Sequence, residues 1–473
     1  MGRRPLKRKR LSQVKIQGMH PEGRGWVTSS QGSMGRRVYV PASIPDEVCD
    51  VVYTASGDYL SGDIEKFHES SIYRREPFCR HANLCGGCSW QHIEYIHQLE
   101  LKKRILLDSL KRSGIACELQ MDVIASPKEQ LFRNRMEYAL TDTRWFYEEE
   151  GEVTAAEDRM GMGFHPEGIS GRIIHIEECY LQEEPSRLIC ESVFEVLKPS
   201  ANDLWNFKTG MGVFRNLEIR INTLGDSIAI LGVAPECAQQ GLAVLMPLAD
   251  KLPENCQLAV NVLANAAKGL SGEEWHFVRG DGYLYEISGR FRFRYSTDSF
   301  YQPNPWQANQ LFEYVASLAN IQPGEIVYDL YSGIGTLSIY LAENAGKVIG
   351  IEGNHKAVLD ADFNANMNGI TNLQNVRGDV LETFRPDFIE KMGNPDVIVL
   401  DPPRSGTLIE INKNIIHSGA SRVVYVSCNP VSLGRDLKLL TTAFEITDIK
   451  AFDMFPHTSH IETVVLLTRK SVD

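Results

Sequence analysis

The alternation of apolar and polar residues divides the chain into three stretches of different texture. From Val14 to about Phe67, short β-rich runs alternate with glycine and proline turns, which is typical of a small β-barrel. Apolar residues at helical spacing then predict a helix over residues 95–112. Residues 120–290 indicate antiparallel β-structure with some helix, including neighbouring strands at 217–222 and 227–233.

After Phe291, apolar strands alternate with helical stretches. The strands are expected at residues 326–330, 347–352, 397–401, 423–427 and 463–468. This pattern predicts an α/β domain with a parallel, doubly wound sheet. Because ligands of such sheets bind at the carboxyl ends of the strands, we expect the chemistry to lie there.

The charge of the chain is unevenly distributed. The 473 residues carry a net charge of -12, which argues against a generally basic nucleic-acid coat protein. Residues 1–40 nevertheless contain ten Lys and Arg and one acid, and residues 1–10 are expected to be a disordered basic arm that reaches phosphates or merely solubilises the chain. An acidic stretch at 148–158 is expected to form an exposed loop of unassigned function. With no apolar run long enough for a membrane span and no apolar segment of a secretory signal, we expect a cytoplasmic protein.

Cysteine spacing singles out one region. Of ten cysteines, Cys79, Cys85 and Cys88 lie close together in residues 71–92, which show little periodicity. In a cytosolic chain such a group indicates ligands or catalytic thiols rather than disulfides. We therefore expect a loop ordered by what its thiols bind.

A glycine-containing turn follows the strand at 326–330. The run from Asp329 to Gly335 opens a helix, and the next strand ends in Glu352, whose carboxylate can accept both hydroxyls of a ribose. Ser338 stands where a dinucleotide fingerprint has its third glycine, and Asp329 precedes the turn. These features favour S-adenosylmethionine over NAD, because the former has no pyrophosphate to bind.

Three further residues with reactive side chains stand at or near strand ends. Asp401 opens a rigid turn with Pro402 and Pro403, and Cys428 follows the fifth strand, where a thiol suits covalent catalysis. Glu462 precedes the last strand and is a candidate base. An inert buried cysteine and a solvated glutamate are the ordinary alternatives, and an amino-group methyltransferase would have an aromatic residue where Arg404 stands.

Taken together, these motifs closely resemble the RNA uridine C5-methyltransferase family. The resemblance rests on residues 299–304, 329–335, 352, 401–404, 427–430 and 460–462. It implies a class I, Rossmann-like methyltransferase domain at 291–473 and a central α+β domain at 71–92 and 120–290. It also implies an OB-like, RNA-binding TRAM barrel at 12–70 after a basic arm at 1–11, with the helix of 93–119 packing on the catalytic domain.

The resemblance also assigns chemical roles. Cys428 would add to uracil C6, and Glu462 would remove the C5 proton after methyl transfer. Asp401 would hold the methyl donor or orient the uracil edge. The positions matched to donor binding are Gln302, Tyr331, Thr336, Glu352, Asp379 and Asp401.

For the clustered cysteines, the family implies a metal centre. Cys79, Cys85, Cys88 and Cys179 resemble the ligands of the [4Fe-4S] cluster in the ribosomal-RNA branch, with zinc as the alternative. Cys190 is the fallback for the fourth ligand.

The implied substrate is a uridine of 23S ribosomal RNA, flipped out of its stack, and the enzyme is expected to act as a monomer. The T-loop of transfer RNA is the second candidate, and a noncatalytic RNA-binding protein with a vestigial methyltransferase fold is the third. The central-domain residues Arg133, Arg135, Arg215 and Arg220 are candidate RNA contacts.

Overall fold

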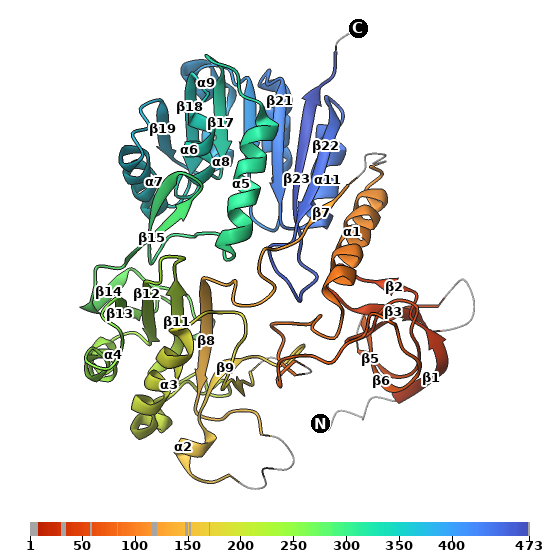
Figure 1. Ribbon diagram of the computed structural model, residues 1–473, viewed down its shortest axis with the longest axis vertical. Coiled ribbons are helices and arrows are strands. Elements are labelled where there is room, and N and C mark those ends of the chain that lie inside the picture. Colours follow the sequence, from red (N-terminus) through yellow and green to blue (C-terminus); the bar gives the residue numbers. More distant parts are fainter. Residues whose placement is uncertain are drawn as a thin grey trace.

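The computed structural model describes residues 8–29, 35–56, 59–82, 84–115, 121–146, 150, 153–169 and 171–471. Figure 1 shows the C-terminal α/β domain at the top, the central sheet at lower left and the first β domain at lower right, with the long helix of residues 95–112 between the α/β domain and the first β domain. None of the helices within these ranges is long and apolar enough to cross a membrane.

The first domain is a six-stranded sheet in the order β1-β5-β6-β4-β3-β2. Its strands are β1 (Arg8–Lys15), β2 (Gly18–Met19), β3 (Gly25–Thr28), β4 (Arg37–Val40), β5 (Val48–Ser56) and β6 (Tyr59–Glu69). Alternate side chains such as Val27, Val38 and Val51 fill its core. The expected disordered arm is wrong for residues 8–10, because they pair with β5 and Arg10 Nη2 lies 2.8 Å from Asp50 Oδ2. Residues 1–7 lie outside the described ranges.

The central domain is built on a seven-stranded sheet in the order β10-β9-β8-β11-β12-β13-β14. The strands are β8 (Arg135–Thr141), β9 (Gly161–Phe164), β10 (Ile174–His175), β11 (Phe214–Ile221), β12 (Ser227–Val233), β13 (Cys256–Val262) and β14 (Glu274–Arg279). The pairing of β11 with β12 is antiparallel as expected, whereas β12 and β13 run parallel, since helix α4 (Ala238–Leu245) crosses between them. Helix α4 and helix α3 (Ser186–Leu197) pack on one face of the sheet.

The acidic stretch at 148–158 lies between β8 and β9. Its described part comprises Glu150, which pairs with Arg144, and residues 153–158, the last three of which belong to the short helix α2 (Ala156–Arg159). The other acids of the stretch, Glu148, Glu149 and Glu152, lie outside the described residues.

The C-terminal domain carries an eight-stranded sheet in the order β19-β18-β17-β20-β21-β23-β22-β7. The strands are β7 (Val123–Ile124), β17 (Ile326–Leu330), β18 (Lys347–Glu352), β19 (Leu373–Arg377), β20 (Val397–Leu400), β21 (Arg422–Ser427), β22 (Phe444–Phe452) and β23 (Glu462–Arg469). The ribbon of β15 (Tyr283–Ser288) and β16 (Phe291–Ser296) leads into this domain. The sheet is doubly wound as predicted, but not wholly parallel, because β22 and β23 are joined by one loop and β23 inserts antiparallel beside β21.

Helices cover both faces of this sheet. One face packs against α5 (Pro305–Ala319), α6 (Thr336–Ala342) and α7 (His355–Met367). The other packs against α1 (Tyr95–Arg112), α9 (Pro386–Met392), α10 (Ile409–His417) and α11 (Pro430–Leu440), and the short helix α8 (Val380–Thr383) follows β19. Successive residues of a strand, such as Val327 and Tyr328, enter the cores on opposite faces of the sheet.

Helix α1 connects the first domain to the catalytic sheet. Leu106 and Leu110 pack against Leu433 and Leu437 of α11. The ammonium of Lys102, itself fully buried, pairs with the equally buried Asp453 carboxylate in the loop between β22 and β23, and also donates to the carbonyl of Phe455 at 3.0 Å. An N-terminal helix thus holds a loop of the C-terminal domain.

Replacing Lys102 with alanine should lower the free energy of unfolding by about 3–5 kcal/mol, because it leaves the Asp453 charge buried without a partner. Urea titration of the full chain measures the loss. The Lys102→Met, Asp453→Leu double variant should recover most of it, and exposed Arg104→Ala on the same helix is the control. A Lys102→Ala loss no larger than the control's would contradict a stabilising role for this contact.

Candidate active site

The glycine turn after β17 has a backbone shape that few residues adopt. Tyr331, Gly333 and Gly335 have φ values of 67°, 54° and 80°, in the left-handed region. The turn ends where Thr336, almost fully buried, begins α6. Beneath it, Asp329 is buried and accepts a hydrogen bond of 2.6 Å from Ser338 Oγ.

Glu352 is tied to this turn. Its Oε2 accepts a hydrogen bond of 3.0 Å from the backbone N–H of Gly333, and its Oε1 accepts one of 2.7 Å from Asn354. Asp379 caps α8 just beyond β19, and its charge helps burial to raise the pKa of Tyr331 to about 12. The predicted donor-binding residues Tyr331, Glu352 and Asp379 therefore gather at one edge of the sheet.

Gln302 reaches this edge from the segment before α5. Its Nε2 lies 3.3 Å from Asp401 Oδ2, and its carbonyl accepts a hydrogen bond of 2.9 Å from Asn134 in the central domain. Asn304, fully buried, caps α5 and donates to Ser126 Oγ at 2.9 Å. These contacts hold Gln302 between the central domain and the C-terminal domain.

Strand pairing brings Cys428 and Glu462 together. Ser427, the last residue of β21, pairs with Thr463, so that Cys428 and Glu462 flank the same rung of an antiparallel ladder. Glu462 is 3% exposed, and its Oε1 has no hydrogen-bond partner among the described residues.

The reactive groups share a poorly solvated space. Burial, together with the charges of Glu462 and Asp401, raises the pKa of the Cys428 thiol to about 12. Burial also raises the pKa of Asp401 to about 6 and, with the charge of Asp401, that of Glu462 well above its usual value. Arg404 opposes the shifts of Cys428 and Glu462, and it is the cation that favours their charged forms.

Hydrogen bonds connect the loops that carry these groups. Asn429 caps α11 and donates from Nδ2 to the carbonyl of Arg404 at 2.9 Å, and Ser432 Oγ donates to the same carbonyl at 3.1 Å. The Arg404 guanidinium lies 3.3 Å from Nδ1 of His460, two residues before Glu462. The loops that follow β20 and β21 and the loop that precedes β23 are therefore joined by hydrogen bonds.

Sequence reasoning missed the residues outside the C-terminal domain that hold the loop between β22 and β23. The His457 backbone N–H donates to Gln98 Oε1 at 2.9 Å, and its carbonyl accepts a hydrogen bond of 2.9 Å from Trp90 N. Trp90 Nε1 in turn donates to the carbonyl of Gly23 in the first domain at 2.8 Å. The available signal was Gln98 itself, a polar residue on the apolar face of α1.

The four candidate arginines differ in their surroundings. Arg220 is 6% exposed and its guanidinium donates to the carbonyls of residues 296, 297 and 299, so this guanidinium is not free to bind a phosphate. Arg135 is half exposed and paired with Glu218 at 2.7 Å. Arg215 bonds to the carbonyl of Ala266, and Arg133 lies over the ring of Phe455 beside the catalytic loop.

The clustered cysteines approach one another without forming a metal site. Among the described residues, no group of three or more His, Cys, Asp or Glu side chains is arranged to hold a metal ion. The thiols are nevertheless close enough that charges on Cys79, Cys85 and Cys179 help burial to raise the pKa of Cys88 to about 12. Charges on Cys85 and Cys79 also act on Cys179, whereas the Cys190 thiol interacts with Tyr138 as well as with Cys179.

The buried Asp329 should make stability depend on pH. Burial raises its pKa to about 7 from 3.8, so between these values the native chain binds a proton that the unfolded chain releases. This contribution to stability is present at low pH and is lost as the pH rises through about 7. Relative to Asp329→Asn, the wild type should lose about 2–3 kcal/mol of unfolding free energy between pH 5 and pH 8.

Urea titrations at both pH values measure this difference. The exposed Asp108→Asn controls for loss of one charge. Parallel pH profiles for the wild type and Asp329→Asn would contradict the assignment.

Comparison with known proteins places the chain in a family. The family model for tRNA (uracil-5-)-methyltransferase matches residues 243–470. An uncharacterized RNA methyltransferase of Bacteroides thetaiotaomicron is 34% identical over 436 residues, covering 91% of this chain and 96% of the relative. One from Porphyromonas gingivalis is 33% identical over 444 residues, covering 92% and 96%.

A solved structure extends the similarity to the fold. The crystal structure of Pyrococcus abyssi tRNA (uracil-54, C5)-methyltransferase in complex with S-adenosyl-L-homocysteine superposes with a TM-score of 0.73 and 25% identity, covering 96% of this chain and 99% of that one. The resemblance seen in the motifs is confirmed. The chain belongs to the uracil-C5 RNA methyltransferases, enzymes that use S-adenosylmethionine to methylate RNA.

Proposed function

We propose that the protein methylates C5 of a specific uridine in 23S ribosomal RNA, with Cys428 as nucleophile and Glu462 as base. The observation that carries this proposal is the convergence of Cys428, Glu462 and Asp401 beside the glycine turn. A half-buried thiol beside two carboxyl groups at the ligand edge of a doubly wound sheet suits covalent catalysis on a base. An amino-group methyltransferase would have no need of the thiol.

We assign donor binding to six residues at this edge. When bound, S-adenosylmethionine supplies an electrophilic methyl group. Glu352, already oriented by the Gly333 N–H, accepts the ribose hydroxyls, and the left-handed turn lets the ligand approach the backbone. Gln302 and Asp401 face each other at the reacting end. The full set is Gln302, Tyr331, Thr336, Glu352, Asp379 and Asp401.

The reaction proceeds by covalent addition and elimination. The Cys428 thiolate adds to uracil C6, which makes C5 an enolate-like carbon, and C5 then takes the methyl group. Glu462 removes the C5 proton, and the electron pair of that C–H bond re-forms the C5–C6 double bond as Cys428 leaves. Burial raises the pKa of the Cys428 thiol, and the positive charge of Arg404 favours the thiolate that the addition requires.

Substrate and domain roles complete the proposal. We assign RNA binding to a TRAM-like domain at 12–70. The central domain comprises 71–92 and 120–290 apart from β7, which joins the sheet of the catalytic domain at 291–473. The cysteine group and this first domain favour ribosomal RNA, whereas the Pyrococcus relative named for uracil-54 of tRNA makes transfer RNA the second candidate. Because all candidate catalytic residues come from one chain, we propose a monomer.

We further propose that Cys79, Cys85, Cys88 and Cys179 hold a [4Fe-4S] cluster. An all-sulfur donor set suits iron–sulfur or zinc. Because the described side chains are not arranged as ligands in this structure, binding the cluster would draw the four thiols together. Methyl transfer needs no redox step, so the cluster would order the loop that carries Trp90 against the catalytic loop.

RNA that contains 5-fluorouridine should trap the proposed intermediate. Fluorine at C5 cannot be removed as a proton, so wild-type protein and donor should form a covalent adduct with 23S ribosomal RNA, visible as a shifted band on a denaturing gel. Transfer RNA should form little adduct. Cys428→Ala should abolish the adduct, while Cys237→Ala, a cysteine at the start of α4, should not.

With ordinary uridine, Glu462→Gln should accumulate the methylated adduct and slow turnover by about 100-fold or more. Methylation without any fluorouridine adduct would contradict the thiol mechanism. An adduct with transfer RNA alone would contradict the ribosomal target.

Protein purified without oxygen should absorb near 400 nm and contain about four iron atoms per chain. Cys88→Ser should lose most of the iron, and Cys190→Ser should keep it. A colourless preparation that contains zinc would replace the iron–sulfur assignment.

A further inference from the structure

A second pocket lies in the central domain, outside the catalytic site. Strand β11 alternates Asn216, Glu218 and Arg220 with Leu217, Ile219 and Ile221, and the apolar set enters the core beneath α3 and α4. The polar set faces the opposite side of the sheet, where it lines a cavity of about 350 Å³. This volume is at the small end of ligand pockets.

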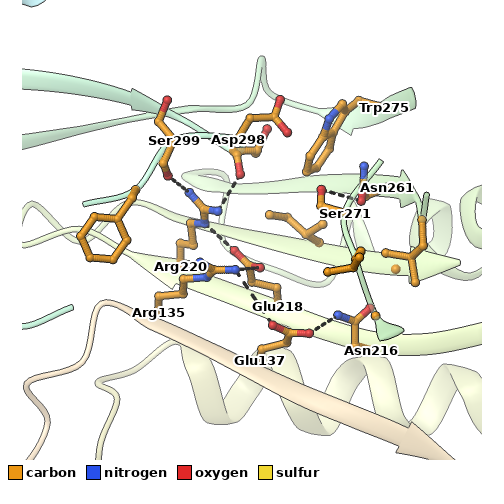
Figure 2. A pocket seen from close by; sticks show the side chains of 17 residues that line it. Arg135, Glu137, Asn216, Glu218, Arg220, Asn261, Ser271, Trp275, Asp298 and Ser299 are labelled. Carbon is orange, nitrogen blue, oxygen red and sulfur yellow. Dashed lines mark hydrogen bonds and ion pairs between the residues drawn. The ribbon is translucent and has the colours of Figure 1, made fainter. Parts of the chain in front are cut away.

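Two buried polar atoms in this pocket have no partner. Asn216 is 7% exposed, and its Nδ2 donates to Glu137 Oε1 at 2.5 Å, which directs Oδ1 the other way. Neither Asn216 Oδ1 nor Trp275 Nε1 has a hydrogen-bond partner within the part of the chain that the structure describes. Figure 2 shows Asn216 and Glu137 on one side of the pocket and Trp275 on the other. An unpaired acceptor and an unpaired donor thus lie in the wall of one cavity with almost no exposed surface, so a ligand reaches them when the Asn216 and Trp275 side chains turn toward it.

Space around Asn216 depends on a glycine. A Cβ built on Gly232 would lie 1.8 Å from Asn216 Oδ1, so any larger residue would displace the amide. The exposed side chain of Leu270 and the indole of Trp275 supply an apolar lining. A flat, partly apolar ligand with polar edges fits such a site.

The charges of the pocket disfavour a phosphate. Glu137, Glu218 and Asp298 outnumber the two arginines, and both guanidinium groups are already paired with Glu218, at 2.7 Å and 2.5 Å. The second Glu137 oxygen forms a long ion pair of 4.0 Å with Arg135, and the charge of Glu137 also acts on Arg215. Together with Asn216 Oδ1, this oxygen makes the pocket richer in acceptors than in donors.

The pocket is connected to the catalytic site. Residues 297–299 line it and continue directly to Gln302. The backbone carbonyl of Asp298 accepts a hydrogen bond from Asn354 Nδ2 at 3.4 Å, and the Asp298 carboxylate pairs with Lys356 at 2.6 Å. Asn354 and Lys356 are close to Glu352 in sequence. A ligand here therefore touches the segment that positions Gln302 and Glu352.

We propose that this pocket binds an unstacked RNA base with an exocyclic amino group, from a nucleotide that flanks the target uridine. This inference rests on the RNA substrate of the family. The two hydrogens of the amino group are donated to Asn216 Oδ1 and Glu137, and a ring acceptor receives the Trp275 Nε1–H. Uracil has a carbonyl where cytosine has its amino group, so it meets carboxylate oxygen and is disfavoured.

Binding of the single-stranded octamers (rC)8 and (rU)8 tests the proposal by fluorescence anisotropy without methyl donor. Both carry the same phosphates, so contacts to the backbone cancel in the ratio of their dissociation constants. The wild type should bind (rC)8 about fivefold or more tightly than (rU)8. Trp275→Ala should weaken (rC)8 binding about tenfold.

The most discriminating variant is Glu137→Gln. Its amide oxygen keeps the bond to Asn216 and its NH2 group now faces the base, so the preference should shift toward (rU)8. Glu137 is 44% exposed, which makes misfolding an inadequate explanation for such a shift. Exposed Glu274→Gln on β14 is the matched control and should keep the wild-type ratio.

Equal binding of the two octamers by the wild type, or an unchanged ratio in Glu137→Gln, would overturn the proposal. Failure of the thiol mechanism is distinguishable, because these measurements require neither Cys428 nor methyl donor. A missing fluorouridine adduct with an intact preference for (rC)8 would reject the mechanism and leave the pocket in place.

Discussion

The antiparallel pairing of β23 with β21 is the constraint on which the catalytic edge depends. Parallel strands alone would bring together only residues that follow strands, such as Asp401 and Cys428. Because β23 runs the other way, its first residue enters the same edge, and the pairing of Ser427 with Thr463 sets Glu462 beside Cys428. Slippage by one residue would turn Glu462 to the opposite face of the sheet.

This arrangement concentrates acidic groups where water is scarce. Asp329, Asp401 and Glu462 all have raised pKa values, chiefly because burial disfavours their charged forms. The native fold therefore contains groups that suit a cationic ligand better than an empty site. Methyl donors with a sulfonium centre are such ligands. Their positive charge offsets the hydration energy that charged carboxylates lose when they are buried.

Local signals in the sequence were enough to predict much of this design. The helix at 95–112 and the strands at 326–330 and 347–352 were predicted at their observed bounds, because apolar periodicity and turn residues agree there. The same reasoning placed the glycine turn and Cys428 at strand ends. It missed the reversal of β23, since strand direction depends on loop paths and leaves no periodic signal. It also took Arg8 to Arg10 for an arm, because charge masked their strand pairing with β5.

The contacts of α1 and β7 have a consequence for how this enzyme can be divided. Strand β7 extends the catalytic sheet at its edge beside β22, and Lys102 of α1 neutralises Asp453, yet both elements precede every strand of the central sheet in the chain. The catalytic domain is therefore discontinuous in sequence. Gene fusion or truncation at a single point after residue 290 would exchange the active-site motifs while removing the helix and edge strand that support them. The whole chain, rather than its C-terminal part, is the unit that recombination can transfer intact.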